Sequence, residues 1–278
     1  MLGRHGFAMV LFSSLRRAAT QPLQRHQLPV SAWRKNSRSC IQLGDVRSFK
    51  ESGHTGDADE LLCAVGGIIG SELPDRVARK ELFEAHAVAR VVDRHFPEET
   101  EITEFCAGCG LLGIFLMLLN PRRRVRCSDK KKQLLACRLQ DALTVHWPFL
   151  QGITWEEEDA RHGQLKTRGE LVASCHACSV LSDEVILTAR RGRSPLVLVP
   201  CCYQKAPRLP REVGWPWLPN WSWKRWPWLE EGSINAQGRD AIHAARVKCL
   251  EEDGYEVWEE FIDPNISKMN MAIVAQPT

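Results

Sequence analysis

The stretch EITEFCAGCGLLGIFLMLLNP, residues Glu101–Pro121, decides the fold. It predicts a short apolar strand over residues 102–106, a glycine-rich turn, and an apolar helix that ends before Pro121. Gly108 and Gly110 let a ligand approach the backbone, and the start of the following helix offers N–H groups without helical partners. The stretch therefore predicts a corner that binds a phosphate-bearing or nucleotide-like ligand.

Length and charge describe one folded domain behind a basic extension. The 278 residues are 44% hydrophobic and 26% charged, which favours a single domain of roughly 200 to 250 residues. Residues 1–50 hold 9 Lys/Arg and one acid, Asp45, so residues 51–278 carry a net charge of −5 although the whole chain carries +3. The folded part thus has no overall basic field to recruit nucleic acid, and only a local basic patch stays open.

The N-terminal composition favours an organelle address. Residues 1–44 are rich in arginine and contain no acid, as transit peptides are, so we expect a mitochondrial or plastid protein. A disordered basic tail on a cytoplasmic protein is the alternative. The 11 cysteines lie mainly in apolar stretches, which favours reduced thiols over a disulfide framework. The sequence contains no run of about 18 apolar residues, so no transmembrane helix is expected.

Strands and helices alternate along the rest of the chain, after a linker over residues 45–57. The expected helices cover residues 57–70, 74–95, the stretch from the glycine turn to before Pro121, residues 130–147, a stretch from about 183, and 239–252. The expected strands cover residues 102–106, 125–129, 153–159, 171–176, 196–201, 254–261 and 268–275. Residues 207–232 interrupt this order with six tryptophans and have no helical or strand period.

The order of these elements predicts the fold class. Five strand–helix units imply an α/β protein with a parallel sheet and helices on both faces. The last two strands are joined by too few residues for a helix, so they are antiparallel. A helical lead-in and a seven-stranded, mostly parallel, Rossmann-like sheet with one antiparallel closing strand form the class I methyltransferase pattern, here over residues 57–278.

Three acids select among ligands for the glycine corner, whose residues 108–113 also satisfy G-x-G-x-x-G. Glu104 precedes the turn, where a carboxylate accepts from a ligand ammonium or from a loop N–H. Asp129 ends the second strand, where an acid binds ribose hydroxyls, and Asp159 ends the third, where an acid accepts from an adenine amino group. A carboxylate under the turn would repel the pyrophosphate of NAD, whereas S-adenosylmethionine (SAM) brings an ammonium there.

Five motifs in order resemble a family of class I SAM-dependent methyltransferases with His-Ala-Cys and Pro-Cys-Cys after the fourth and fifth strands. They are KELFEAHAVAR at residues 80–90, EFCAGCGLLG at 104–113, SCHACSVLSDEVI at 174–186, LVPCCY at 198–203 and GYEVWEEFIDPNISKMNMAIVA at 254–275. The resemblance spans roughly 200 residues and implies the methyltransferase fold and SAM binding. Its relatives include a tRNA 2′-O-methyltransferase. Cys106 and Cys109 depart from the common pattern, and the tryptophan-rich segment has no counterpart in it.

Candidate site residues gather at the ends of the first five strands. The cofactor-binding set is Glu104, Ala107, Gly108, Gly110, Asp129, Asp159 and Cys175. The catalytic candidates are His176, Cys201 and Cys202. His176 is either a general base or a pocket-shaping residue that binds loop carbonyls. Cys201 and Cys202 are either nucleophiles, as in enzymes that methylate pyrimidine C5, or small buried hydrophobes that fix a turn.

Two further patterns have alternatives. The pairs Cys106/Cys109 and Cys175/Cys178 share C-x-x-C spacing on neighbouring strands, which makes a Cys₄ zinc site conceivable, although thiolates there would fill the cofactor corner, so no metal is expected. The tryptophans around Lys224 and Arg225 either stack unpaired bases or form a lid or interaction patch.

The sequence therefore predicts a SAM-dependent methyltransferase, expected to be a monomer. The family resemblance, and not the charge of the domain, favours an RNA such as tRNA as the acceptor. A small molecule or protein acceptor stays open, as does a catalytically inactive binding module of the same fold. An NAD-dependent oxidoreductase is disfavoured by Glu104 and by the antiparallel closing pair.

Overall fold

The computed structural model describes residues 57–74, 76–160, 165–178, 180–200, 229–230, 233–234, 236–263, 266–267 and 270–278. Its helices are α4 (Asp57–Glu72), α5 (Arg79–His95), α6 (Leu111–Leu119), α7 (Leu134–Thr144), η1 (Pro148–Gly152), α8 (Val180–Gly192) and α9 (Ala236–Glu252). Its main strands are β1 (Glu101–Phe105), β2 (Arg124–Asp129), β3 (Thr154–Glu157), β4 (Leu171–Cys175), β5 (Leu196–Val199), β8 (Tyr255–Phe261) and β9 (Met271–Pro277). A short pair, β6 (Leu229–Glu230) and β7 (Ser233–Ile234), stands apart from them.

The seven main strands form one sheet in the order β3-β2-β1-β4-β5-β9-β8. The pairs from β3 to β5 are parallel, whereas β9 runs antiparallel to both β5 and β8. One strand is therefore reversed, which confirms the predicted Rossmann-like methyltransferase fold. The strand order changes direction between β1 and β4, and parallel α/β sheets bind ligands at such a point, beyond the carboxyl ends of the strands.

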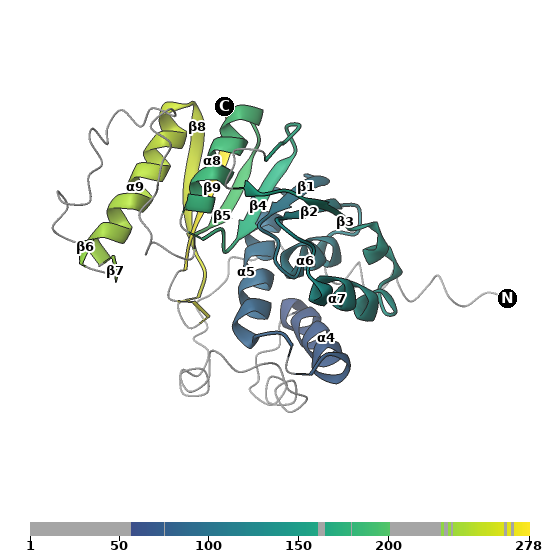
Figure 1. Ribbon diagram of the computed structural model, residues 1–278. Helices are drawn as coiled ribbons and strands as arrows, with labels where there is room; N and C mark the ends of the chain where they lie inside the picture. The colour runs from purple at the N-terminus through teal and green to yellow at the C-terminus, as the bar shows by residue number, and fades with distance from the viewer. Residues whose placement is uncertain are drawn as a thin grey trace.

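Helices cover both faces of this sheet (Figure 1). One core lies between the sheet and α4 to α7, and a second lies between the sheet and α8 and α9. Neighbouring residues of a strand divide between the two cores, as Ala173 and Val172 do in β4, because side chains alternate across a strand. Helix α6 is buried over its first eight residues, which explains why its sequence is apolar on every side.

Several expected boundaries are wrong. Helix α4 runs unbroken through Gly66 and Gly67 to Glu72, because α4 packs closely on α5 at Gly66: an added Cβ there would lie 3.3 Å from Leu82 Cδ2. Helix α5 begins at Arg79 rather than at Pro74, since Ala78 is extended.

The helix after β2 also differs from its prediction. It spans only residues 134–144, because Gln133 is extended, and Leu134 at its first position is 67% exposed. Ala136, Leu139 and Leu143 are its buried residues.

Arg123, in the turn before β2, joins two helix ends. Its guanidinium lies 3.2 Å from the Phe96 carbonyl, 3.4 Å from the Leu116 carbonyl and 3.1 Å from Asp93 Oδ1. Its Nε donates to the Glu99 carbonyl at 3.3 Å. Through these contacts the buried cation connects the ends of α5 and α6 near the amino end of β1.

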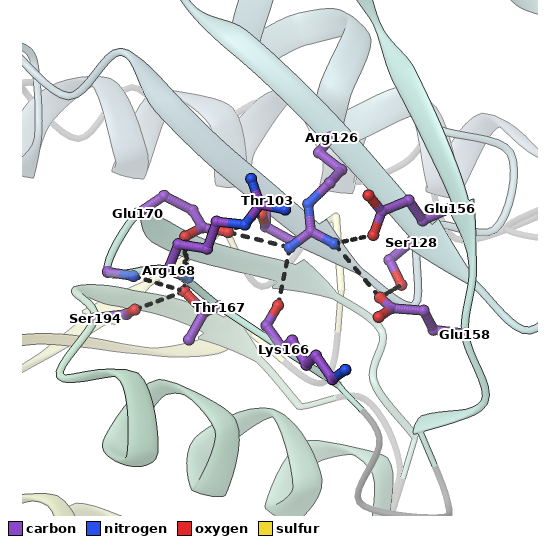
Figure 2. A network of polar contacts seen from close by, with 11 residues as sticks. Thr103, Arg126, Ser128, Glu156, Glu158, Lys166, Thr167, Arg168, Glu170 and Ser194 are labelled. Carbon is purple, nitrogen blue, oxygen red and sulfur yellow. Dashed lines mark hydrogen bonds and ion pairs between the residues drawn. The ribbon is translucent and has the colours of Figure 1, made fainter.

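A network of polar contacts connects side chains of β1 to β3 with the segment that leads to β4 (Figure 2). Arg126 of β2 pairs with Glu156, Glu158 and Glu170 and donates to the Lys166 carbonyl at 2.9 Å. The link from β3 to β4 is described over residues 158–160 and 165–170, and none of these residues lies in an α-helix. Within the part of the chain that the structure describes, no helix is long and apolar enough to cross a membrane.

Candidate functional site

The turn after β1 depends on three residues with positive φ. Cys106, Gly108 and Gly110 have φ of 57°, 57° and 78°, so the chain reverses within a few residues. The Gly110 N–H donates to the Ala107 carbonyl at 2.8 Å, and α6 begins at the next residue. The first N–H groups of α6 thus face the carboxyl edge of the sheet next to the turn, a geometry that favours an anionic ligand group.

A row of side chains lies under the start of α6. Glu104, Cys127 and Trp155 are register partners on β1, β2 and β3 and face the same side of the sheet. A Cβ at Gly113 would lie 2.8 Å from Cys127 Sγ and 2.9 Å from Glu104 Oε2, and a Cβ at Gly110 would lie 2.7 Å from the Trp155 ring. Both glycines are therefore required for α6 to lie this close to the sheet.

Glu104 lies inside this row. It is 2% exposed, and its Oε2 accepts from the Gly113 N–H at 2.9 Å and lies 3.2 Å from Cys127 Sγ. The sequence predicted that Glu104 accepts from a loop N–H or from a ligand ammonium. The N–H that it binds belongs to Gly113 of α6 rather than to the loop. The contact with a ligand ammonium stays a prediction. Burial raises the pKa of Glu104 to about 8, so a neutral carboxyl at pH 7 does not repel a pyrophosphate. The exclusion of NAD then depends on the reversed β9.

The raised pKa of Glu104 predicts a pH-dependent stability. The folded protein holds this proton up to about pH 8, whereas the unfolded chain releases it near the ordinary value of 4.5. The free energy of unfolding should therefore fall as the pH rises from about 5 to 8. Glu104→Gln should flatten this slope in urea unfolding, whereas the exposed control Glu101→Gln should retain it. An unchanged slope in Glu104→Gln would show that another group causes it.

Asp129 and Asp159 come together beside the turn. Asp129 Oδ2 accepts from the Gly108 N–H at 2.8 Å, so the acid that ends β2 also fixes the glycine turn. Asp159 follows β3 by two residues rather than ending it, and it pairs with Lys130 at 3.4 Å. Both carboxylates lie near Cys106 and help burial to raise its pKa to about 12.

The cysteines of the corner are neutral thiols. Burial raises the pKa of Cys109 to about 12, as it does that of Cys106, and Cys109 packs partly buried against the larger core. Within the described residues, no group of three or more His, Cys, Asp or Glu side chains has an arrangement that would hold a metal ion. The structure therefore gives the conceivable Cys₄ zinc site no support, and the thiols act as small apolar groups that fill the turn.

His176 is held at the carboxyl end of β4. Its φ is 75°, in the left-handed region, and its N–H donates to the Val199 carbonyl of β5 at 3.1 Å. Its Nε2 lies 2.6 Å from Oε2 of Glu84, a residue of α5 that is 1% exposed. Burial lowers the pKa of His176, but the contacts with Cys175 and Glu84 outweigh it and raise the pKa to about 10. This raised pKa favours the imidazolium at neutral pH. The two roles predicted for His176, a general base or a residue that shapes the pocket, stay predictions.

Sequence reasoning missed Glu84 as a site residue. The signal was present, because Glu84 is a carboxylate between Phe83 and Ala85 on the apolar face of an amphipathic helix, where charged groups need a partner. Cys175, the last residue of β4, is half-buried, and burial raises its pKa while His176 lowers it. Cys201 and Cys202 lie outside the described residues, as do residues 1–56 and most of the tryptophan-rich segment.

Comparisons with known proteins find one matching family and a curated relative. Residues 82–208, just under half of the chain, match a family described as a methyltransferase domain. A curated relative from Drosophila pseudoobscura pseudoobscura, a glutathione S-transferase C-terminal domain-containing protein homolog, is 29% identical over 141 residues. That match covers 50% of this chain and 23% of the relative, so it spans about a quarter of that protein.

Solved structures of methyltransferases also resemble the chain at low identity. The magnesium protoporphyrin IX methyltransferase of Synechocystis PCC 6803, solved with bound SAH, is 14% identical, with coverage of 99% and 97% and a TM-score of 0.43. A putative RNA methyltransferase from Pyrococcus horikoshii is 14% identical, with coverage of 78% of this chain and 96% of that one and a TM-score of 0.44. The fold assignment itself rests on the strand order of this chain.

Proposed function

We propose that this chain is a SAM-dependent methyltransferase. The observation that carries the proposal is the glycine turn after β1, which lies at the point where the strand order reverses and is bonded to the acid that ends β2. The reversed β9 and the match of residues 82–208 to a methyltransferase domain family support the same class. SAM, when bound, supplies an activated methyl group on a sulfonium.

The residues of the corner have distinct roles in this proposal. Gly108, Gly110 and the start of α6 would bind the amino-acid part of the cofactor through backbone groups, with Ala107 in the same turn. Asp129, while holding the Gly108 N–H, would accept from the ribose hydroxyls. Asp159 would bind the adenine amino group, and Cys175 would line the donor side at the end of β4.

The acceptor would lie beyond the ends of β4 and β5. A displacement at a methyl group needs an aligned acceptor and the exclusion of water more than it needs a strong catalytic group. His176 and Glu84 provide a fixed polar group at this edge. The weakly favoured acceptor, RNA, depends on the family resemblance and not on the charge of the domain.

Replacing Asp129 tests the cofactor assignment. Asp129→Ala removes the acceptor for the Gly108 N–H and for the ribose, so we expect SAM affinity to fall at least about tenfold in calorimetry. Asp141→Ala, at an exposed position of α7, is the matched control and should bind SAM like the wild type. Equal affinity in both variants, or no SAM binding by the wild type at micromolar concentration, would contradict the proposal.

The acceptor class can be read from label transfer. Full-length protein with tritiated-methyl SAM is incubated separately with total RNA, total protein and a small-molecule extract. Label in the RNA fraction would support the favoured class, whereas label in another fraction would replace it. SAM binding without label in any fraction would favour the inactive binding module.

A further inference from the structure

Glu84 is a buried carboxylate that joins three parts of the fold. It lies on α5, within the apolar surface that packs on the sheet, and is 1% exposed. Its Oε2 lies 2.6 Å from His176 Nε2 at the end of β4, and its Oε1 lies 3.0 Å from Lys80 Nζ on the preceding turn of α5. The Ser267 side chain, between β8 and β9, also faces it. Burying such a group without a compensating role would destabilise the fold.

The His176 end of this pair is strained as well. A left-handed φ of 75° is unfavourable for a residue with a Cβ, by about 1 to 2 kcal/mol. Nε2 of His176 and the carboxylate oxygens of Glu84 are buried and lack an aligned hydrogen bond within the described residues, although the two groups are in contact. A strained backbone and an imperfectly bonded buried ion pair at one site are features that cluster at functional sites.

The contacts of the ring decide what His176 can do. The 2.6 Å approach of Nε2 to a carboxylate oxygen favours a proton on Nε2, although the two groups are not aligned for a hydrogen bond. Nε2 is therefore occupied by Glu84 and does not face the acceptor as a free base. The ring also contacts the Cys175 side chain. The groups that contact the ring are therefore the Glu84 carboxylate of α5 and the Cys175 thiol of β4. Lys80 and the Ser267 hydroxyl contact Glu84 in turn.

We propose that Glu84 is a positioning residue that holds His176 at the carboxyl edge of β4 as a fixed cation, so that His176 orients the methyl acceptor and does not deprotonate it. This inference rests on the proposed function and adds to it. It favours an acceptor atom that carries a lone pair without losing a proton to His176, such as a ring nitrogen or an ionised group. A hydroxyl acceptor would need a base from another part of the chain.

The charge state of His176 can be measured without knowing the acceptor. We expect the ring ¹⁵N shifts of His176, assigned with His176→Gln, to be those of an imidazolium from pH 6 to 8, with the proton lost near pH 10. In Glu84→Gln the titration should move to near the ordinary value of about 6.5. Glu84→Asp, which keeps the charge, should retain part of the upward shift. Glu60→Gln, at an exposed position of α4, should leave the titration unchanged.

The outcomes separate the two proposals. A wild-type His176 that titrates near pH 6.5 would overturn the inference without any variant. The inference can therefore be tested even if Glu84→Gln does not fold. An unchanged His176 titration in folded Glu84→Gln would also overturn it. SAM calorimetry on the same samples tests the proposed function independently: binding by the wild type together with either of these results would leave the methyltransferase and remove the positioning role of Glu84.

Discussion

Gly110→Ala should both destabilise the protein and weaken its binding of SAM. Gly110 has φ of 78°, and an added Cβ would lie 2.7 Å from Cζ2 of Trp155. The left-handed backbone and the overlap together should lower the free energy of unfolding by about 2 to 5 kcal/mol. Relief of the overlap requires the Trp155 ring or the start of α6 to move, and a shift of α6 would displace the backbone N–H groups that we assign to the cofactor. SAM affinity should fall more than tenfold, an effect larger than that expected for Asp129→Ala.

Gly152→Ala is the matched control for this substitution. Gly152 ends η1, and a Cβ there would meet only Cε of Met117, at the ordinary contact distance of 3.5 Å. Its free energy of unfolding in urea should stay within about 1 kcal/mol of that of the wild type. If Gly110→Ala is as stable as Gly152→Ala and binds SAM normally, then the turn is not the cofactor corner that we describe.

The fold could be predicted because its signals are local. Apolar strands, the glycines of residues 108–113 and Pro121 lie within one stretch, and the short link between the last two strands required an antiparallel pair. Boundaries that depend on packing could not be predicted in this way. Glycines lower the helix propensity of α4, yet α4 runs unbroken through Gly66 and Gly67, because Leu82 packs at Gly66 and tertiary contacts outweigh propensity.

The sequence indicated the backbone turn of the candidate site, but it did not indicate the charge states of the buried side chains around it. Gly108 and Asp129 are in contact as their places after β1 and β2 suggested. The charge states of Glu104 and His176, in contrast, depend on burial and on partners far along the chain. Burial makes Glu104 a weaker acid, and the contact with Glu84, 92 positions before His176 in the chain, helps to keep the histidine protonated. The spacing of residues along the sequence does not reveal which side chains become buried or which distant partners they meet.

Arg123→Met should cause the largest loss of stability of the substitutions considered. Methionine keeps the apolar stem of the side chain but removes four polar contacts, one with Asp93 and three with backbone carbonyls. The carbonyls of Phe96 and Leu116, at the ends of α5 and α6, would then be left without this donor. Breaking a buried ion pair on one side lowers the free energy of unfolding by about 3 to 5 kcal/mol, which urea unfolding measures.

Arg124→Met, one residue further on, separates this effect from the loss of any arginine. The Arg124 side chain is 82% exposed and pairs with Glu101 at 3.4 Å, so its removal should change the stability by less than about 1 kcal/mol. Arg123→Lys should fall between the two, because it keeps the charge but not the planar group that reaches several acceptors at once. A similar loss in Arg123→Met and Arg124→Met would mean that α5 and α6 are held against β1 by their apolar contacts alone. Helix α5, which carries Glu84, would then not depend on the polar contacts of Arg123 at its carboxyl end.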